Sequence, residues 1–427
     1  MELPPEDPDY GQDLCGRLNV HMYGTRPAAE GWHNEYATTV NEMGFMVGIS
    51  SACVFYHPEW HLASLVHRDD FTIVGPKSSL DLFVGKLREK YELKEATRLG
   101  PAPCDDKEGR ILNRIVRWTS KGLEYEADPR QAEKLIEDLG LNGAKGLSTP
   151  AVKPSIGSVR ADTKLPESKV THFRALAATA NYLSADRPEC QLAAKEICRF
   201  MAEPTALSAE ALKRLGRYLV KFPRLVYHYP FQEEVRELDV YVDTDHAGCL
   251  RTRKSTSGGC IIAGKHLLKS WSSTQPTVTL SSGEAELHGV VKGGANGLGF
   301  LSLLGDFHIS LKLRLWTDSS ASKGMCARQG LGKVRHLDVQ DLWIQQRLRN
   351  GDFALYKVRG DDNPGDMFTK ASLTYHRIEA LLGALGCVYR QGRAESAPAL
   401  RHKGGEKKVL KVERRPRWSD ENEVETE

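Results

Sequence analysis

The sequence predicts an α/β protein whose second half is a mixed five-stranded sheet flanked by helices. Residues 237–243 (ELDVYVD) alternate apolar and polar side chains like a half-buried strand, with antiparallel neighbours expected at 257–264 and 267–273. Helical and strand patterns then alternate, and the remaining elements are expected as strands at 313–318 and 354–358 and helices at 282–304, 335–349 and 365–385.

The first half mixes short strands and helices. Residues 62–66 and 71–75 are β-prone on either side of a charged turn, which predicts a hairpin with Asp69 and Asp70 at its tip. The other expected elements are an amphipathic helix at 78–93, a weaker helix at 129–140, a proline- and serine-rich linker at 146–158 and a helical region at 171–220.

Length and composition narrow the class of protein. The 427 residues suggest two or three domains, and 59 Lys and Arg against 56 Asp and Glu neither demand nor exclude a polyanionic partner. The nine cysteines form no C-x-x-C pair, which argues against a zinc knuckle or a disulfide framework. With no apolar run of membrane-spanning length and no signal peptide, we expect an intracellular protein of the cytoplasm or nucleus without a membrane partner.

Four acidic residues stand out because each lies at an expected element boundary: Asp243, Glu286, Asp318 and Asp366. Carboxylates that converge repel one another unless a cation neutralises them, and oxygen ligands suit Mg²⁺ or Mn²⁺. Such a site predicts phosphodiester hydrolysis with two metal ions. Any single one of these residues is more simply a surface acid, but their joint occurrence at boundaries favours the site.

The helix at 282–304 offers two glutamates, and only one is expected to face the metals. Ser281 and Glu284 have capping-box spacing, which gives Glu284 a structural role. Residues two apart on a helix point in nearly opposite directions, so Glu286 is left to face the metals.

These segments resemble the Pol polyprotein of copia-type (Ty1/copia) retrotransposons, in the family's order from about residue 15 to 372. The stretches DTDHAGCLRTRKSTSGG, SWSSTQPTVTLSSGEAEL, LWTDSSASK, VRHLDVQDLWIQQRL and GDMFTK resemble its ribonuclease H domain. MYGTRPAAEGW and VHRDDF resemble its reverse transcriptase. The resemblance implies a truncated polymerase palm and thumb at 1–150, a linker and helical connection at 151–232 and a ribonuclease H domain at 233–388. The end of the chain is rich in charge and poor in apolar residues, which predicts a disordered charged tail at 389–427.

The resemblance also implies roles for individual residues. Asp243, Glu286, Asp318 and Asp366 would be the catalytic metal ligands of a ribonuclease H that cuts the RNA strand of RNA–DNA hybrids. The residues implied to touch the nucleic acid are Arg251, Arg253, Lys254, Arg335 and His336. For His336 a plain structural role stays equally open.

The polymerase half departs from the family. A polymerase site needs a third carboxylate on an earlier strand, for which this sequence has no room, and Arg68 precedes the aspartate pair where a small or apolar residue is usual. We therefore expect Asp69 and Asp70 to be a vestigial metal site and predict no DNA synthesis by this chain.

Two alternatives stay open. One is a degenerate or host-adopted relic that binds nucleic acid without catalysis, through the basic residues above and the Lys- and Arg-rich segment 401–417. The other is an integrase or transposase, which would usually bring a His/Cys zinc module that this sequence lacks. Whether the chain self-associates or binds other element-encoded proteins is not indicated by any motif.

Overall fold

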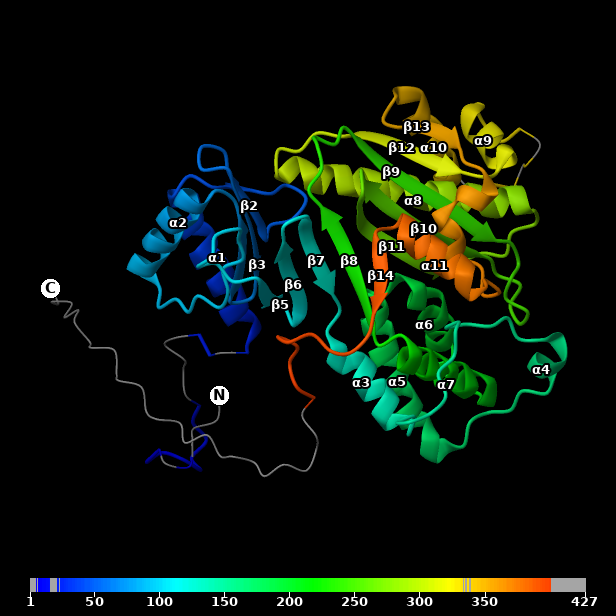
Figure 1. Cartoon of the computed structure of the whole chain (residues 1–427), viewed down its shortest axis with the longest axis horizontal. Coiled ribbons are helices and arrows are strands. Elements are labelled where there is room, and N and C mark those ends of the chain that lie inside the picture. The colour runs from blue at the N-terminus through cyan, green and yellow to red at the C-terminus, as the bar shows by residue number, and fades with distance from the viewer. Residues whose placement is uncertain are drawn as a thin grey trace, which may run out of the picture.

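The computed structural model describes residues 5, 7–15, 21–22, 24–332, 334, 336–337 and 339–400. Its strands form three sheets, of which one is mixed and two are antiparallel, and the α/β class is confirmed (Figure 1). Arg335 and the segment 401–417 lie outside the described residues. Within the described part, no helix is both long and apolar enough to cross a membrane.

The N-terminal sheet is a four-stranded antiparallel meander of β1 (Met46–Val47), β2 (Val54–His57), β3 (Leu62–His67) and β4 (Asp70–Val74). Helices α1 (Arg26–Glu42) and α2 (Lys77–Lys90) pack on it around a core that includes Tyr36, Phe55 and Phe83. The predicted hairpin and the helix that follows it are confirmed.

A second sheet was not predicted. Its five antiparallel strands have the order β14-β8-β7-β6-β5, and their bounds are β5 (Glu108–Ile111), β6 (Arg114–Thr119), β7 (Gly122–Glu126), β8 (Arg224–Pro230) and β14 (Cys387–Arg390). Strands β5–β7, β8 and β14 come from three regions far apart in sequence, so this sheet joins units that were expected to be separate. Strand β14 includes Tyr389 and Arg390, which the sequence assigned to a disordered tail.

Helices pack beside this second sheet. They share a core with Leu176, Leu215 and Tyr218, and their bounds are α3 (Pro129–Asp138), α5 (Glu167–Ser184), α6 (Gln191–Cys198) and α7 (Ala206–Lys221). The predicted helix near 129–140 and the helical region at 171–220 are confirmed. The linker before α5 is extended apart from the short helix α4 (Ile156–Arg160).

The third sheet is the five-stranded mixed sheet that the sequence predicts. Its order is β11-β10-β9-β12-β13, with bounds β9 (Glu237–Asp245), β10 (Thr256–Ala263), β11 (His266–Thr274), β12 (Lys312–Thr317) and β13 (Ala354–Lys357). The first three strands are antiparallel, whereas β12 runs parallel to both β9 and β13. We call this sheet and its helices the mixed-sheet domain.

Helices cover both faces of that sheet. One face carries α8 (Ser282–Asp306), with α9 (Ser320–Ala327) and α10 (Val339–Asn350) beside it, around Val240, Val290 and Leu315. The other face carries α11 (Tyr375–Ala384) and the 3₁₀ helix η3 (Pro364–Phe368). The prediction of one helix over 365–385 is wrong: Thr374 caps a separate helix after a break at 369–374. Helix α9 was not predicted.

The mixed-sheet domain also contacts the N-terminal sheet. At the end of α8, the carboxylate of Asp306 accepts hydrogen bonds from the backbone amides of Ile49, Ser50 and Ser51 at 2.8 to 3.2 Å. The ring of Tyr56 stacks on His308 with centroids 4.7 Å apart. The turn after β1 is thus anchored to α8.

Candidate metal centre

Two aspartates are placed side by side by strand register. Strands β9 and β12 are parallel neighbours, and Val242 pairs with Thr317. The next residue on each strand is an aspartate, so Asp243 and Asp318 meet at the same edge of the sheet. Carboxyl ends of parallel strands commonly hold ligands in α/β sheets.

Helix α8 delivers the third carboxylate because glycines let it approach the sheet closely. A Cβ on Gly293 would lie 2.4 Å from Cγ1 of Val242, and one on Gly289 would lie 2.6 Å from Oγ1 of Thr244. Glycines inside a helix usually need such a packing reason, since alanine is the better helix former. The close packing brings Glu286, in the second turn of α8, to the strand that carries Asp243.

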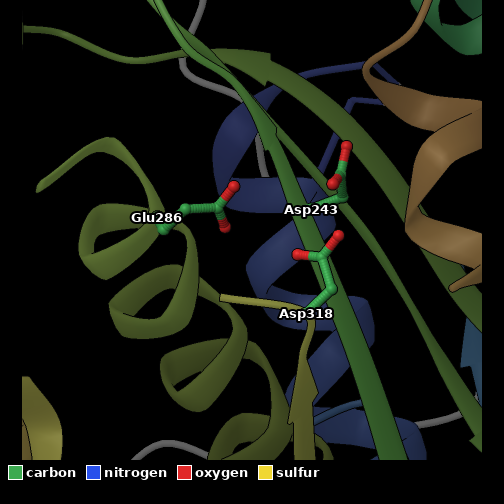
Figure 2. Close-up of side chains that lie close together, drawn as sticks. All are labelled: Asp243, Glu286 and Asp318. Atoms are coloured by element: carbon green, nitrogen blue, oxygen red, sulfur yellow. The ribbon is translucent and has the colours of Figure 1, made fainter. Parts of the chain in front are cut away.

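The three carboxylates converge on one point. One oxygen each of Asp243, Glu286 and Asp318 lies within 4.8 Å of the other two, and Figure 2 shows their side chains facing a common space. Asp243 is 2% exposed, whereas the other two are half-buried. This is the only group of three or more potential metal ligands among the described residues.

The electrostatics of this cluster favour a bound cation. Burial raises the pKa of Asp243 to about 6. Burial, and then the charges of Asp243 and Asp318, raise the pKa of Glu286 to about 9. One oxygen of Glu286 is buried without a hydrogen-bond partner. A divalent cation would complete that acceptor and offset the repulsion, and an all-oxygen ligand set fits Mg²⁺ or Mn²⁺.

Asp366 lies next to the cluster but is not part of it. Its carboxylate, 6% exposed, is bonded to the ammonium of Lys370 and lies 3.2 Å from Nη2 of Arg377. The Lys370 ammonium also lies 3.9 Å from Oδ1 of Asp243. Burial opposes the charge of Lys370, but the carboxylates of Asp243 and Asp366 raise its pKa. The structure thus unites three of the four predicted acids and pairs the fourth with basic side chains.

Sequence reasoning missed the residues that hold this segment against β9. The amide of Asn363, fully buried, donates to the carbonyl of Val242 at 2.9 Å and accepts from the backbone of Gly365 at 3.0 Å. The Thr369 hydroxyl donates to Oδ2 of Asp243. All three lie in the NPGDMFTK stretch that the sequence singled out for Asp366 alone.

The two glutamates near the start of α8, Glu284 and Glu286, have different partners. Glu284 turns away from the cluster: one oxygen accepts from the backbone of Leu280 at 2.9 Å and lies 3.0 Å from Nε2 of His336. Ser281 caps the helix through the backbone of Glu284, at 3.2 Å. The reciprocal bond of a capping box goes to Leu280 instead of Ser281. Burial opposes ionisation of Glu284, but the bonds from His336 and Leu280 lower its pKa.

The basic residues between β9 and β10 differ in their surroundings. Arg251 is paired with the fully buried carboxylate of Asp162 and lies over the ring of Phe200 at 5.1 Å, so it ties the linker to this turn. The side chains of Arg253 and Lys254 make no hydrogen bond or ion pair within the described part of the chain. They are free to contact a ligand.

A cleft of about 730 Å³ adjoins the turn after β9 and the segment after η3. Its walls come from the linker, helices α6 and α7, the turn after β9 and the segment after η3. Lys370, Arg214, Arg217 and Lys153 are among the basic side chains that line it. Lys370 therefore faces both the cleft and the acidic cluster.

The aspartate pair of the N-terminal sheet has a different environment. Asp69 lies in the turn between β3 and β4, Asp70 begins β4, and both are exposed. Arg68 has a left-handed φ of 57°, and its carbonyl accepts from the indole of Trp32 at 2.8 Å. Among the described residues, neither aspartate belongs to a group of three potential metal ligands.

Comparison with known proteins finds the chain similar to transposon polyproteins. No protein-family model matches it. It is 28% identical over 389 residues to the retrovirus-related Pol polyprotein from transposon RE2 of Arabidopsis thaliana, and 24% identical over 387 residues to that from transposon TNT 1-94 of Nicotiana tabacum. These alignments cover 87% and 86% of the chain but only 25% and 28% of the relatives. The chain thus spans about a quarter of their length.

A shorter relative and two solved structures are also similar. An uncharacterized mitochondrial protein of Arabidopsis thaliana is 29% identical over 226 residues, which are 52% of this chain and 87% of that protein. The N-terminal RNase H domain of a Mycobacterium tuberculosis protein aligns over 35% of this chain and 99% of that chain, with 17% identity and a TM-score of 0.24. A foamy viral protease-reverse transcriptase in complex with dsDNA aligns over 79% of this chain and 60% of that chain, with 10% identity and a TM-score of 0.44.

Proposed function

Because the chain is similar over most of its length to the Pol polyproteins of copia-type retrotransposons, we propose that its mixed-sheet domain is a ribonuclease H. The substrate is an RNA–DNA hybrid, and the reaction is hydrolysis of a phosphodiester in the RNA strand. The observation that carries the proposal is the convergence of Asp243, Glu286 and Asp318 on one point at the carboxyl ends of two parallel strands.

The side chains have distinct roles in this proposal. Asp243, held by the Thr369 hydroxyl, would hold the metal ions together with Glu286, Asp318 and Asp366. Two Mg²⁺ or Mn²⁺ ions, when bound, supply a nucleophilic water and stabilise the leaving 3′ oxygen. The buried, partnerless oxygen of Glu286 is the acceptor that best fits a metal ligand.

Substrate binding would rest on the basic turn between β9 and β10. Arg253 and Lys254 have free side chains that can reach phosphates, which position a duplex without reading its bases. The RNA strand is distinguished by its 2′-hydroxyl, so we expect strand selectivity without sequence specificity. Reactions of this kind would occur inside the cell, in the cytoplasm or the nucleus.

The polymerase half is proposed to be inactive. Asp69 and Asp70 lie on one exposed hairpin, and within the described residues no third acidic side chain gathers with them. Two-metal chemistry needs the ions held in fixed positions. We therefore expect no extension of a primer on an RNA template by this chain alone.

A second candidate function is a nucleic-acid-binding relic without catalysis. One observation favours it: Asp366 is paired with Lys370 and Arg377 and is not joined to the other three acids. The basic turn would remain as a binding surface. This candidate predicts salt-sensitive hybrid binding without cleavage.

Cleavage of a hybrid labelled on both strands separates the two candidates. The full chain is incubated with the hybrid in Mg²⁺ and in Mn²⁺, beside an Asp243→Asn variant. Cleavage of the RNA strand only, and its loss in the variant, is the result that the ribonuclease H proposal expects. Binding without cleavage in either metal would contradict it and favour the relic.

A further inference from the structure

The acidic cluster is divided into two halves that differ in their counter-charges. On one side, Asp366 is bonded to Lys370 and lies 3.2 Å from Arg377, and the Lys370 ammonium is also 3.9 Å from Asp243. The side chains of Asp366 and Asp243 are 9% and 3% exposed, so both carboxylates are largely shielded from water. Positive charge is already present in this half.

In the other half, no basic side chain of the described residues lies within ion-pair distance. Glu286 and Asp318 make no ion pair within the described residues, and Oε2 of Glu286 is buried without a partner. A bound cation is therefore needed to neutralise Glu286 and Asp318, whereas Lys370 and Arg377 already neutralise Asp366.

Local backbone geometry directs Lys370 to this place. The chain turns after η3, where the amide of Lys370 donates to the carbonyl of Asp366 at 2.9 Å. The turn sends the Lys370 side chain back over the Asp366 carboxylate. A Cβ on Gly258 would lie 2.5 Å from Cβ of Phe368, so η3 also lies close against β10. The ammonium is thus placed by a tightly packed segment and not by a mobile loop.

We propose that Lys370 is a built-in counter-ion that occupies the cation position between Asp243 and Asp366. The free chain then binds one divalent ion, at Asp243, Glu286 and Asp318, and binds a second only when Lys370 moves away. This inference rests on the proposed metal-dependent nuclease function. A divalent ion and an ammonium a few ångströms apart repel each other strongly in a site with little water, so the two cannot share the position.

The surroundings of Lys370 allow it to leave. Its side chain is 40% exposed, and it lines the cleft of about 730 Å³ between the linker, α6 and α7. A lysine stem is flexible, and its ammonium can be rehydrated in that cleft. Arg377 would remain on Asp366, so the carboxylate keeps a partner after Lys370 has moved.

The test counts Mn²⁺ ions bound to the full chain by calorimetry, without nucleic acid. The wild type should bind one ion, and Lys370→Met should bind two, with affinity for the second at least about tenfold above that of the wild type. Lys269→Met is the matched control, because it removes a lysine of β11 that contacts Asn296 and should leave one ion. In the double variant Lys370→Met/Asp366→Asn, the second ion should be lost and the first kept.

The outcomes separate this inference from the function on which it rests. One ion in both the wild type and Lys370→Met, or two in both, would overturn the role of Lys370 while leaving a metal site intact. No ion in any variant would overturn the metal-dependent function as well. Lys370→Gln, which is also neutral, serves as a second variant if Lys370→Met does not fold, as judged by circular dichroism.

Discussion

The chain presents aspartates at strand ends in two places, and the two places differ in how many elements contribute. Asp69 and Asp70 come from a single exposed hairpin, β3–β4. The cluster of Asp243, Glu286 and Asp318 is assembled from two strands and a helix that are far apart in sequence. Exposed carboxylates are solvated by water, whereas converging ones in a partly dry site need a cation. The convergence of carboxylates from several elements, more than the residue type, therefore distinguishes a candidate metal site from a charged turn.

The largest expected contrast is in catalysis. Asp318→Asn removes one ligand from the cluster and should reduce hybrid cleavage by about a thousandfold, since metal position controls the chemistry. The double variant Asp69→Asn/Asp70→Asn should cleave at the wild-type rate. Initial rates with a labelled hybrid in Mg²⁺ check both. Equal loss in the two variants would remove the distinction between the sites.

The packing of α8 gives the next contrast. Gly293→Ala places a methyl group against Val242 and should reduce the free energy of unfolding by about 1–3 kcal/mol, with a fall in cleavage as Glu286 is displaced. Gly299→Ala in the same helix is the control, because nothing lies within 4 Å of its Cβ. It should gain about 0.5–1 kcal/mol from the helix propensity of alanine. Urea denaturation measures both, and a stabilising Gly293→Ala would contradict the close-packing argument.

A smaller effect concerns stability without metal. The folded chain raises the pKa of Glu286 to about 9, so the folded state holds a proton that the unfolded state releases near pH 4.5. Stability from this group is full below that pH and is lost as the pH rises toward 9. In EDTA at pH 8, Glu286→Gln should therefore raise the melting temperature by about 2 °C or more.

Two controls define that result. The gain from Glu286→Gln should vanish at pH 4, where the glutamate is protonated in both states. Asp69→Asn, on the exposed hairpin, should leave the melting temperature unchanged at both pH values. A melting temperature of Glu286→Gln below that of the wild type at pH 8 would contradict the electrostatic account of the cluster.

The smallest expected effect concerns hybrid binding, where Arg253, which has no ion-pair partner among the described residues, should differ from Arg251, which is paired with Asp162. Arg253→Ala should weaken hybrid binding and lower the salt slope of the affinity by about one, as expected for one lost phosphate contact. Arg251→Ala should instead reduce the free energy of unfolding by about 1–3 kcal/mol, because Asp162 would be left buried and without its ion pair. Fluorescence anisotropy at several salt concentrations, with denaturation curves, distinguishes the two.

Sequence patterns predicted the hairpin β3–β4, most helices and the mixed sheet, because each shows its period within one segment. The second sheet could not be predicted because polar side chains interrupt the apolar pattern of its short strands. Arg117 there pairs with Glu108, Glu124 and Glu126, so the period of two is masked by charge. Its strands also come from regions far apart in sequence, which no local pattern can join.

The site was predictable only where its residues lie at the boundary of an element with a clear local pattern. Element boundaries pointed to Asp243, Glu286 and Asp318, which the fold brings together. The partners of Asp366 were not predictable, because a motif gives residue types and not which charges meet. Only the turn after η3 reveals that Lys370 lies on Asp366. The break between η3 and α11 was hidden by apolar residues at near-helical spacing.

Anomalous diffraction from crystals of the full chain grown in Mn²⁺ tests the central claim most directly. An anomalous peak bounded by the carboxylates of Asp243, Glu286 and Asp318, with none at the Asp69–Asp70 turn, is the predicted result. No peak at the cluster, or a stronger one at the hairpin, would contradict the assignment of the metal centre.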